Sequence, residues 1–317
     1  MEKYYPWDWH EVSPLSLHSR KYRDLKDLAD HGDQGQYALV QRKGDGRLFI
    51  RKTFRKILKD GATPDRWWRE VDLIRKLRHD NIQQYEEASL CLIQGEIYLE
   101  YCPFGSLSHF KGYMNGSSGK KVPESFAKHI FRGLVGALCY LHCGIHELEH
   151  VHDPDLRGIG CEPWVPILHC DITIDSVHLK LYRNEVYPVP KLTNFNFAFR
   201  RFPGTDDTPF WAQDAGTDGW VPPEHPTKSQ RGDVFQVGAV IQCLCDPNWT
   251  RANPEGGLGQ DYSDDFQKLV RAAMTKELKD RPDAPEMAQM LLAMEGDTPP
   301  EYEVIPDEAF EKIHQHQ

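Results

Sequence analysis

The sequence has no apolar run that approaches the roughly 18 residues of a membrane-spanning helix. Its first residues, MEKYYPWDWHEV, lack the apolar core of a secretion signal. Positive charge is also scarce, because 38 Lys and Arg against 48 Asp and Glu give a formal net charge of -10. Nucleic acids and anionic membranes attract clustered positive charge, so we expect neither as a partner. Eight scattered cysteines without a secretion signal predict reduced thiols in an intracellular protein, cytoplasmic or nuclear.

The sequence contains enough apolar residues for a large core, since 39% of its 317 residues are hydrophobic. Its first third is rich in strand patterns. Two apolar runs, 36–42 and 47–54, flank a Gly-Asp-Gly turn, which predicts a hairpin. Residues 64–77 begin with Pro-Asp and repeat apolar residues at helical spacing, which predicts an amphipathic helix. A second pair of strands is expected at 89–93 and 96–101.

The remaining two thirds are mostly helical in pattern. Residues 125–142 predict a long core helix, and a polar insertion follows at 144–166. Short strands are expected at 165–169, 177–182 and 188–193, before a Gly- and Pro-rich stretch that leads into further helices. This order indicates an α+β fold with two lobes. The boundaries that we predict are an N-terminal arm at 1–22, an N-terminal lobe at 23–102, a C-terminal lobe at 103–295 and an acidic tail at 296–317.

Eight short motifs, in the same order and at matching spacing, resemble the protein kinase family, of the eukaryotic Ser/Thr type, from about residue 28 to residue 294. They are IRK ending at Lys52, Glu70 in REVDLIRKL, LEYCPFGSL at 99–107, ILHCDITIDSV at 167–177, KLTNFNFA at 191–198, GWVPPE at 219–224, Asp233 in DVF, and Arg281 with Pro282. The resemblance implies a bilobal fold, with a small β-rich N-lobe that carries one helix and a larger helical C-lobe. The insertion at 144–166 resembles one seen in many fungal kinases.

In that family, Lys52 would hold the α and β phosphates of ATP and Glu70 would position it by an ion pair. The resemblance implies further nucleotide-binding positions at Gly32, Gly35, Leu99, Glu100 and Cys102, with Leu99 as the gatekeeper of the hinge. The glycine-rich loop is altered, since Asp30 replaces its first glycine and Asp33 adds a second carboxylate. Carboxylates repel a polyphosphate. ATP is thus the implied cofactor, and the sequence leaves open whether it binds.

The catalytic loop retains Asp171, which matches the aspartate that accepts the proton of the substrate hydroxyl. The groups that handle metal and phosphate differ from the family pattern. Cys170 replaces an arginine that receives an activation-loop phosphate, Thr173 a lysine for the γ-phosphate, Ser176 a metal-binding asparagine, Asn194 the metal-binding aspartate and Asn196 a glycine. Mg²⁺ prefers charged oxygen ligands, so we expect no metal site at Asn194 and Ser176.

These changes predict a pseudokinase. Loss of one preorganised electrostatic group commonly costs about 10²–10³ in rate. The expected function is therefore binding of a protein partner, through the activation segment, the hinge-side cleft, the arm or the tail. The alternative is a weakly active Ser/Thr kinase in which Asp171 is the base and Lys52 holds ATP. The oligomeric state is left open.

Groups that hold the family's fold are retained. Glu224 and Arg281 are expected to form a buried ion pair, and Asp233 to hold the catalytic-loop backbone. Because these motifs belong to the protein-kinase branch, we do not expect a small-molecule kinase, and nothing supports tyrosine specificity. Cysteine and histidine side chains also gather in and beside the insertion, but their spacing matches no standard zinc finger, so we expect no metal there: Cys143, His146, His150, His152 and Cys161.

Overall fold

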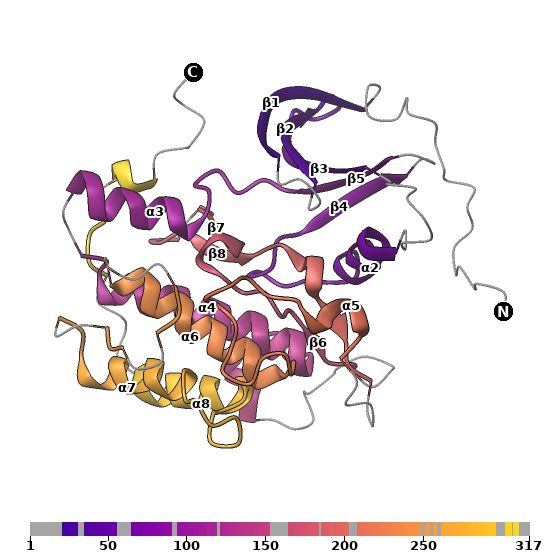
Figure 1. Ribbon diagram of the computed structural model, residues 1–317. Helices are drawn as coiled ribbons and strands as arrows, with labels where there is room; N and C mark the ends of the chain where they lie inside the picture. Colours follow the sequence, from indigo (N-terminus) through magenta and orange to yellow (C-terminus); the bar gives the residue numbers. More distant parts are fainter. Residues whose placement is uncertain are drawn as a thin grey trace. The chain divides into compact units, whose positions relative to one another are not determined.

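A computed structural model shows the fold (Figure 1). The residues that the structure describes are 21–30, 35–55, 65–90, 94–118, 121–152, 164–183, 185–202, 208–246, 248, 251–253, 256–258, 261–295, 302–305 and 307–310. Contacts divide the chain into two compact units, Met1–Leu77 with Gln84–Tyr101, and Arg78–Gln83 with Cys102–Gln317. Each unit is described by itself.

The first unit is a five-stranded antiparallel sheet in the order β1-β2-β3-β5-β4 (Figure 1). Both predicted strand pairs are confirmed. The strand predicted at 36–42 has that same range, whereas the other three differ from their predicted ranges by one to four residues. The elements of this unit are β1 (Tyr22–Asp30), β2 (Gln36–Arg42), β3 (Leu48–Arg55), helix α2 (Asp65–Ile74), β4 (Tyr85–Leu90) and β5 (Gln94–Glu100).

The core of this sheet forms on one of its faces, where Tyr22, Ala38, Val40, Phe49 and Tyr98 are buried together. The Tyr22 ring stacks on Tyr98 at 4.1 Å and meets Phe49 edge-on at 5.9 Å. Such aromatic pairs add to the stabilisation from burial. Tyr22 is the last residue of the predicted arm, and it begins β1 instead, because its ring completes this core.

The second unit is mostly helical. Helix α4 packs against α6 and α8, and α7 packs against both α6 and α8. Gly144 ends α4 in the left-handed conformation with φ 74°, and its N–H donates to the Tyr140 carbonyl at 2.8 Å. The helices are α3 (Leu107–Tyr113), α4 (Glu124–Cys143), α5 (Phe210–Gln213), α6 (Gln230–Cys245), α7 (Asp264–Ala273) and α8 (Ala284–Glu295). The long helix predicted at 125–142 is thus confirmed.

Two short antiparallel pairs carry the loops of the second unit. Strand β6 (Ile167–Leu168) pairs with β9 (Phe199–Arg200), and β7 (Val177–Lys180) pairs with β8 (Val189–Leu192). The catalytic-loop and DFG-like motifs therefore lie at the ends of paired strands. A strand-rich first unit and a helical second unit confirm the predicted α+β class.

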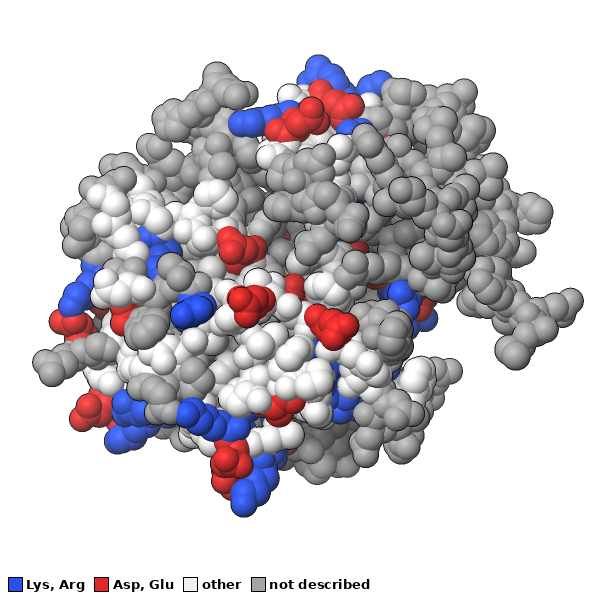
Figure 2. Space-filling view, in the orientation of Figure 1, with Lys and Arg blue, Asp and Glu red and all other residues white. Residues whose placement is uncertain are grey.

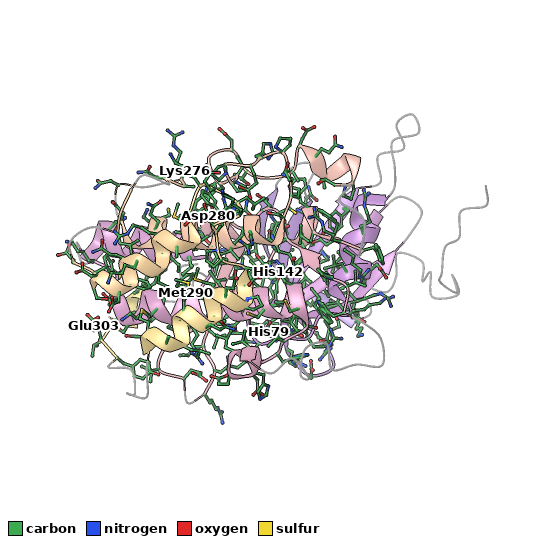
Figure 3. All side chains as sticks on the ribbon, turned by 90° about the horizontal axis from the view of Figure 1, so that it is seen from below. His79, His142, Lys276, Asp280, Met290 and Glu303 are labelled. Atoms are coloured by element: carbon green, nitrogen blue, oxygen red, sulfur yellow. The ribbon has the colours of Figure 1, made fainter. Side chains whose placement is uncertain are left out.

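Part of the predicted C-terminal tail packs on the second unit. The Tyr187 hydroxyl donates to the Glu303 carbonyl at 2.6 Å, and the Glu303 N–H donates to Ser125 Oγ at 3.2 Å (Figure 3 labels Glu303). Phe310 stacks on Phe110 at 5.4 Å. Ile305 is buried. Glu303, Ile305 and Phe310 of the predicted tail thus pack against their own chain, whereas the tail was expected to contact a partner.

No helix among the described residues is long and apolar enough to cross a membrane. On the face shown in Figure 2, acidic and basic side chains of the described residues are interspersed and do not form one continuous field of a single sign.

Candidate functional site

The first unit brings together two of the predicted site residues, Lys52 on β3 and Glu70 on α2. Lys52 Nζ lies 2.9 Å from both carboxylate oxygens of Glu70. The two side chains are only 1% and 3% exposed. Burial lowers the pKa of Lys52, but the Glu70 carboxylate and the Tyr37 hydroxyl more than offset this, so that the pKa is raised. Lys52 therefore stays an ammonium ion in a closed, hydrogen-bonded pair.

Tyr37, on β2, is a contact of Lys52 that sequence reasoning missed. Lys52 Nζ lies 5.6 Å from the centre of the Tyr37 ring, and the two side chains are hydrogen-bonded. Nζ also lies 4.8 Å from the centre of the Phe54 ring. The signal available in the sequence was the position of Tyr37 two residues after Gly35 at the start of a strand, which places it opposite β3.

Gly35 is the described glycine of the predicted phosphate loop, and Gly32 lies outside the described residues. Gly35 has φ +107°, and a Cβ built on it would stand 2.8 Å from the Thr53 carbonyl oxygen. Only glycine tolerates both constraints. Its conformation and the closeness of β3 are thus a sufficient reason for the glycine, with no phosphate needed to explain it.

The three predicted hinge residues lie at the end of β5 and just beyond it. Leu99 is buried on β5, opposite Ile50 of β3. The Glu100 N–H donates to the Gln84 carbonyl at 2.8 Å, and its carboxylate accepts the Gln84 N–H at 3.1 Å. Cys102, the first residue after Tyr101 in the second unit, is buried, and its carbonyl accepts the Gly105 N–H at 3.2 Å.

In the second unit, Asp171 is held by Thr217, a residue that the sequence analysis did not single out. The Thr217 N–H and hydroxyl both donate to Asp171 Oδ1, each at 2.8 Å. The Asp171 side chain is buried. Thr217 lies two residues before the motif at 219–224, so its position was visible in the sequence but its contact with Asp171 was not. The carboxylate is thereby fixed between the catalytic loop and the activation segment.

Asp233 on α6 holds the backbone of the catalytic loop, as predicted. Its carboxylate accepts the His169 N–H and the Cys170 N–H, both at 2.9 Å, and contacts His142 Nε2 at 3.0 Å. His142 lies among the helices of this unit (Figure 3). A buried carboxylate with three hydrogen-bond partners is well compensated. The loop is thus held in place by an element that performs no chemistry.

Cys170, at the position of the family's phosphate-binding arginine, belongs to an apolar cluster. Its backbone has φ 67°, and burial raises the pKa of the thiol well above its usual value. It packs with Leu168, Phe199, Ala212 and Ala215. The activation segment at Ala212 and Ala215 is therefore held by apolar packing at this point.

Lys228 is a second residue that the sequence did not reveal. It is 3% exposed, and its ammonium donates to the Ala215 carbonyl and contacts His225 Nδ1 at 3.1 Å. Burial lowers the pKa of Lys228 overall, although nearby Cys170, Asp171 and Asp233 oppose this. The Lys228 side chain is thus committed to the activation-segment backbone.

The DFG-like turn is closed by its own two asparagines. Asn194 adopts the left-handed conformation with φ 66° and ψ 59°. Asn196 Nδ2 donates to Asn194 Oδ1 at 2.6 Å. The side-chain oxygen that would replace the family's metal-binding carboxylate is therefore neutral and already accepts a hydrogen bond from within the turn.

Ser176 is committed in the same way. The Thr173 N–H donates to Ser176 Oγ at 2.8 Å, and Ser176 Oγ donates to the Thr173 carbonyl at 3.0 Å. The Ser176 N–H in turn donates to Thr173 Oγ1 at 3.3 Å, which completes a capping box around a short 3₁₀ turn at Ile174–Ser176. Thr173 and Ser176, at the lysine and asparagine positions, satisfy each other.

The family's Mg²⁺ does not fit these residues. A magnesium ion takes near-octahedral coordination by hard, preferably charged oxygens. The two protein oxygens at its positions are neutral, and both already hold hydrogen bonds within their own turns. No group of three or more His, Cys, Asp or Glu that could hold a metal occurs among the described residues. Cys161 of the predicted cysteine–histidine cluster lies outside them.

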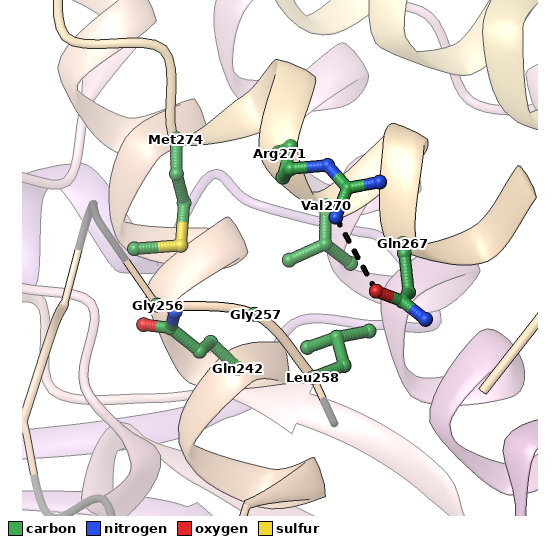
Figure 4. Close-up of a pocket in the computed structure, with 8 residues that line it drawn as sticks. All are labelled: Gln242, Gly256, Gly257, Leu258, Gln267, Val270, Arg271 and Met274. Atoms are coloured by element: carbon green, nitrogen blue, oxygen red, sulfur yellow. Dashed lines mark hydrogen bonds between the residues drawn. The ribbon is translucent and has the colours of Figure 1, made fainter. Parts of the chain in front are cut away.

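A small void in the second unit lies away from these residues. It is lined by Gln242 of α6, Leu258, and Gln267 and Met274 of α7 and its C-terminal cap (Figure 4). Its volume of about 10 Å³ holds one water at most. There the Gln242 side chain donates through Nε2 to the Asn253 carbonyl at 2.7 Å, and its Oε1 accepts the Asn253 N–H at 2.9 Å. The void is a packing feature and not a ligand site.

His178 on β7 makes stability depend on pH. Burial lowers its pKa from 6.5 to about 4, and nearby His109 lowers it further, while Asp175 opposes this. In the unfolded chain this histidine is therefore protonated below about pH 6.5, but in the folded chain only below about pH 4. We expect the free energy of unfolding to fall as pH drops across this window, by at most about 1.4 kcal/mol per pH unit for this histidine.

Urea unfolding of the full chain at pH 7, 6 and 5 measures this slope. His178→Gln is expected to flatten it. The contributions of the other histidines whose pKa burial lowers remain, namely His79, to about 4, with His129 and His225. His150→Gln is the matched control, since that side chain is 46% exposed. An unchanged slope in His178→Gln would contradict the assignment.

A family model and several known proteins are similar to this chain. The model of the protein kinase domain matches residues 24–293. The G2-specific protein kinase nim-1 of Neurospora crassa is 28% identical over 237 residues, which cover 72% of this chain and 26% of that protein. The mitogen-activated protein kinase kinase kinase A of Dictyostelium discoideum is 24% identical over 296 residues, which cover 85% and 27%.

The G2-specific protein kinase nimA of Emericella nidulans is 27% identical over 236 residues, covering 71% of this chain and 32% of that protein. This chain thus spans about a quarter to a third of the length of the relatives that it matches.

Proposed function

Because the chain belongs to the protein kinase family, we propose that it is a pseudokinase, a kinase-fold protein that acts by binding a protein partner and does not transfer phosphate with ATP and Mg²⁺. The observation that carries this proposal is the state of the two metal positions. Asn194 Oδ1 accepts from Asn196, and the Ser176 hydroxyl is closed in its capping box. A metal ion at these positions would meet only neutral oxygens, each already hydrogen-bonded within its own turn.

Phosphoryl transfer depends almost entirely on positioning and on cations that stabilise the developing charge. One preorganised electrostatic group is commonly worth about 10²–10³ in rate. Three such positions are altered here, Thr173, Ser176 and Asn194. Even one such loss, without multiplying the effects, lowers a typical kinase turnover of about 1–100 s⁻¹ to about 10⁻³–1 s⁻¹.

The scaffold needed for binding is retained. Asp233 holds the catalytic loop, and the Arg281–Glu224 ion pair joins the end of the activation segment to the helical core. Packing at Cys170 holds the activation segment without an arginine that would need a phosphate. These features support a fixed activation segment as a partner-binding surface. The arm at 1–22 and the tail at 296–317 are further candidate contacts.

The second candidate function is a weakly active Ser/Thr kinase. Two observations favour it, the intact Lys52–Glu70 pair and the orientation of Asp171 by Thr217. The relatives are named as protein kinases. In this account Asp171 would be the general base and Lys52 would hold ATP, but the account leaves the developing charge without a metal.

A phosphotransfer assay distinguishes the two. The full chain is incubated with γ-labelled ATP and a generic protein substrate, with Mg²⁺, with Mn²⁺ and with EDTA. The matched control is Asp171→Asn, which keeps an oxygen to accept the bonds of Thr217. We expect the wild type and the control to incorporate the same background label. Incorporation in the wild type that disappears in Asp171→Asn would overturn the proposal in favour of the weak kinase.

A further inference from the structure

The side chain of Tyr37 stands directly opposite Lys52 in the first unit. The register pairs Tyr37 of β2 with Lys52 of β3, and Lys52 in turn with Ile97 of β5. Directly paired residues share one face of a sheet. Tyr37 and Lys52 therefore lie on the same face as Leu99, which the same register places opposite Ile50. This is the face on which the family resemblance puts the nucleotide.

The hydrogen-bond capacity of Lys52 is accounted for on this face. An ammonium group has three N–H donors and accepts nothing. Two of the bonds go to the Glu70 carboxylate, each at 2.9 Å, and a third joins the Tyr37 hydroxyl. The Tyr37 ring itself lies over the ammonium, with 5.6 Å from Nζ to its centre. Lys52 is 1% exposed as a result of all its contacts.

We propose that the Tyr37 side chain takes the place beside the Lys52 ammonium where a phosphate would bind. A polyphosphate ligand can then reach Lys52 only when the Tyr37 side chain is displaced. This inference deepens the proposed function and rests on it, since it explains how the cation can be retained without serving a nucleotide. It identifies Tyr37 as the residue that controls anion access at this position.

Charge explains why a tyrosine suits this role. Lys52 and Glu70 together carry no net charge, and a neutral phenol satisfies the remaining donor without changing that balance. A phosphate at the same place would add negative charge beside the buried Glu70 carboxylate. A charge-assisted hydrogen bond contributes about 1.5–3 kcal/mol net, which is about tenfold or more in an equilibrium constant. A phosphate that displaces Tyr37 must first compensate for this lost hydrogen bond before its own contact with Lys52 favours binding.

The test is ATP binding without metal. The full chain in EDTA is titrated with ATP by isothermal calorimetry, for the wild type and for Tyr37→Phe and Tyr37→Val. Tyr37→Phe removes the oxygen alone, and Tyr37→Val also removes the ring. We expect at least one of them to bind ATP about tenfold or more tightly than the wild type. Tyr98→Phe is the matched control, because it removes a hydroxyl bonded to Glu96 on the opposite face of the same sheet.

The inference is overturned if neither variant of Tyr37 binds more tightly, or if Tyr98→Phe gains as much. Circular dichroism confirms that each variant folds, and Tyr37→Phe decides alone if the valine variant does not. Failure of the proposed function is recognised separately. Phosphotransfer that depends on Asp171 would contradict the pseudokinase assignment whatever Tyr37 does, whereas absent tightening contradicts only the role of Tyr37.

Discussion

Replacing Arg281 by alanine is expected to lower the free energy of unfolding by about 3–5 kcal/mol, because it leaves the Glu224 carboxylate without its partner. Arg281 is 0% exposed. Its guanidinium donates to both Glu224 oxygens, at 2.7 and 2.9 Å. It also donates to the Thr275 carbonyl at 2.8 Å, from a turn that includes Lys276 and Asp280 (Figure 3). Urea unfolding followed by circular dichroism measures the change.

Arg281→Lys is the matched control. It keeps the charge but replaces a planar fork with a single ammonium, so it can hold Glu224 but not all the surrounding carbonyls. We expect its free energy of unfolding to lie between those of the wild type and the alanine variant. A loss below about 1 kcal/mol in Arg281→Ala would show that the pair behaves like an exposed salt bridge, which contradicts its burial.

Replacing Lys52 by methionine is expected to cost a similar amount, about 3–5 kcal/mol, although this position belongs to the nucleotide-binding machinery of the family. The substitution leaves the Glu70 side chain, which is 3% exposed, without the cation that holds both of its oxygens. It also removes the partner of the Tyr37 hydroxyl. Thermal and urea unfolding of the full chain measure the effect.

The double variant Lys52→Met with Glu70→Leu is the control for this explanation. Removing both charges replaces a buried ion pair by apolar groups, which is often neutral or stabilising. We expect the double variant to recover most of the lost stability. If it is as unstable as Lys52→Met alone, the cost comes from packing and not from the unpaired carboxylate. Either variant needs a folding check before any loss of ligand binding is assigned to the phosphate role of Lys52.

Much of the fold was predictable because short sequence patterns, which occur in the same order as in the family, specify its elements. The helical spacing of residues 64–77 and 125–142 anticipated α2 and α4, and the Gly-Asp-Gly turn anticipated the β2–β3 hairpin. The pairings of Lys52 with Glu70 and of Arg281 with Glu224 followed from the family resemblance, and the structure forms both. Removing one partner of such a buried pair is costly.

The hydrogen bonds within the site were not predictable, because they depend on strand register and on side-chain directions within irregular loops. The family resemblance implied that Asn194 and Asn196 differ from the family pattern, but not that one donates to the other. It did not show that Ser176 and Thr173 satisfy each other. Nor did it show that Thr217 holds Asp171. These contacts join residues whose approach is fixed only once the surrounding strands pair.

The contact of Tyr37 with Lys52 shows the same limit in the first unit. An aromatic residue in a strand is ordinary, and its face depends on a register that a single-residue slip would reverse. Only the pairing of Tyr37 with Lys52 reveals which group it meets. Tyr22 is a comparable case, since its predicted place in an arm gave way to the aromatic core of the sheet.

The central claim is that the metal–nucleotide site of the family is not assembled in this chain. Its most direct test is the thermal unfolding midpoint of the full wild-type chain with ATP in Mg²⁺ and with ATP in EDTA, each against the matching buffer without ATP. A ligand that binds only the folded state must raise the midpoint. The account predicts the same ATP-dependent shift, or none, in both conditions. A shift that appears only with Mg²⁺ would contradict it, because the metal would then be binding with the nucleotide at the positions of Asn194 and Ser176.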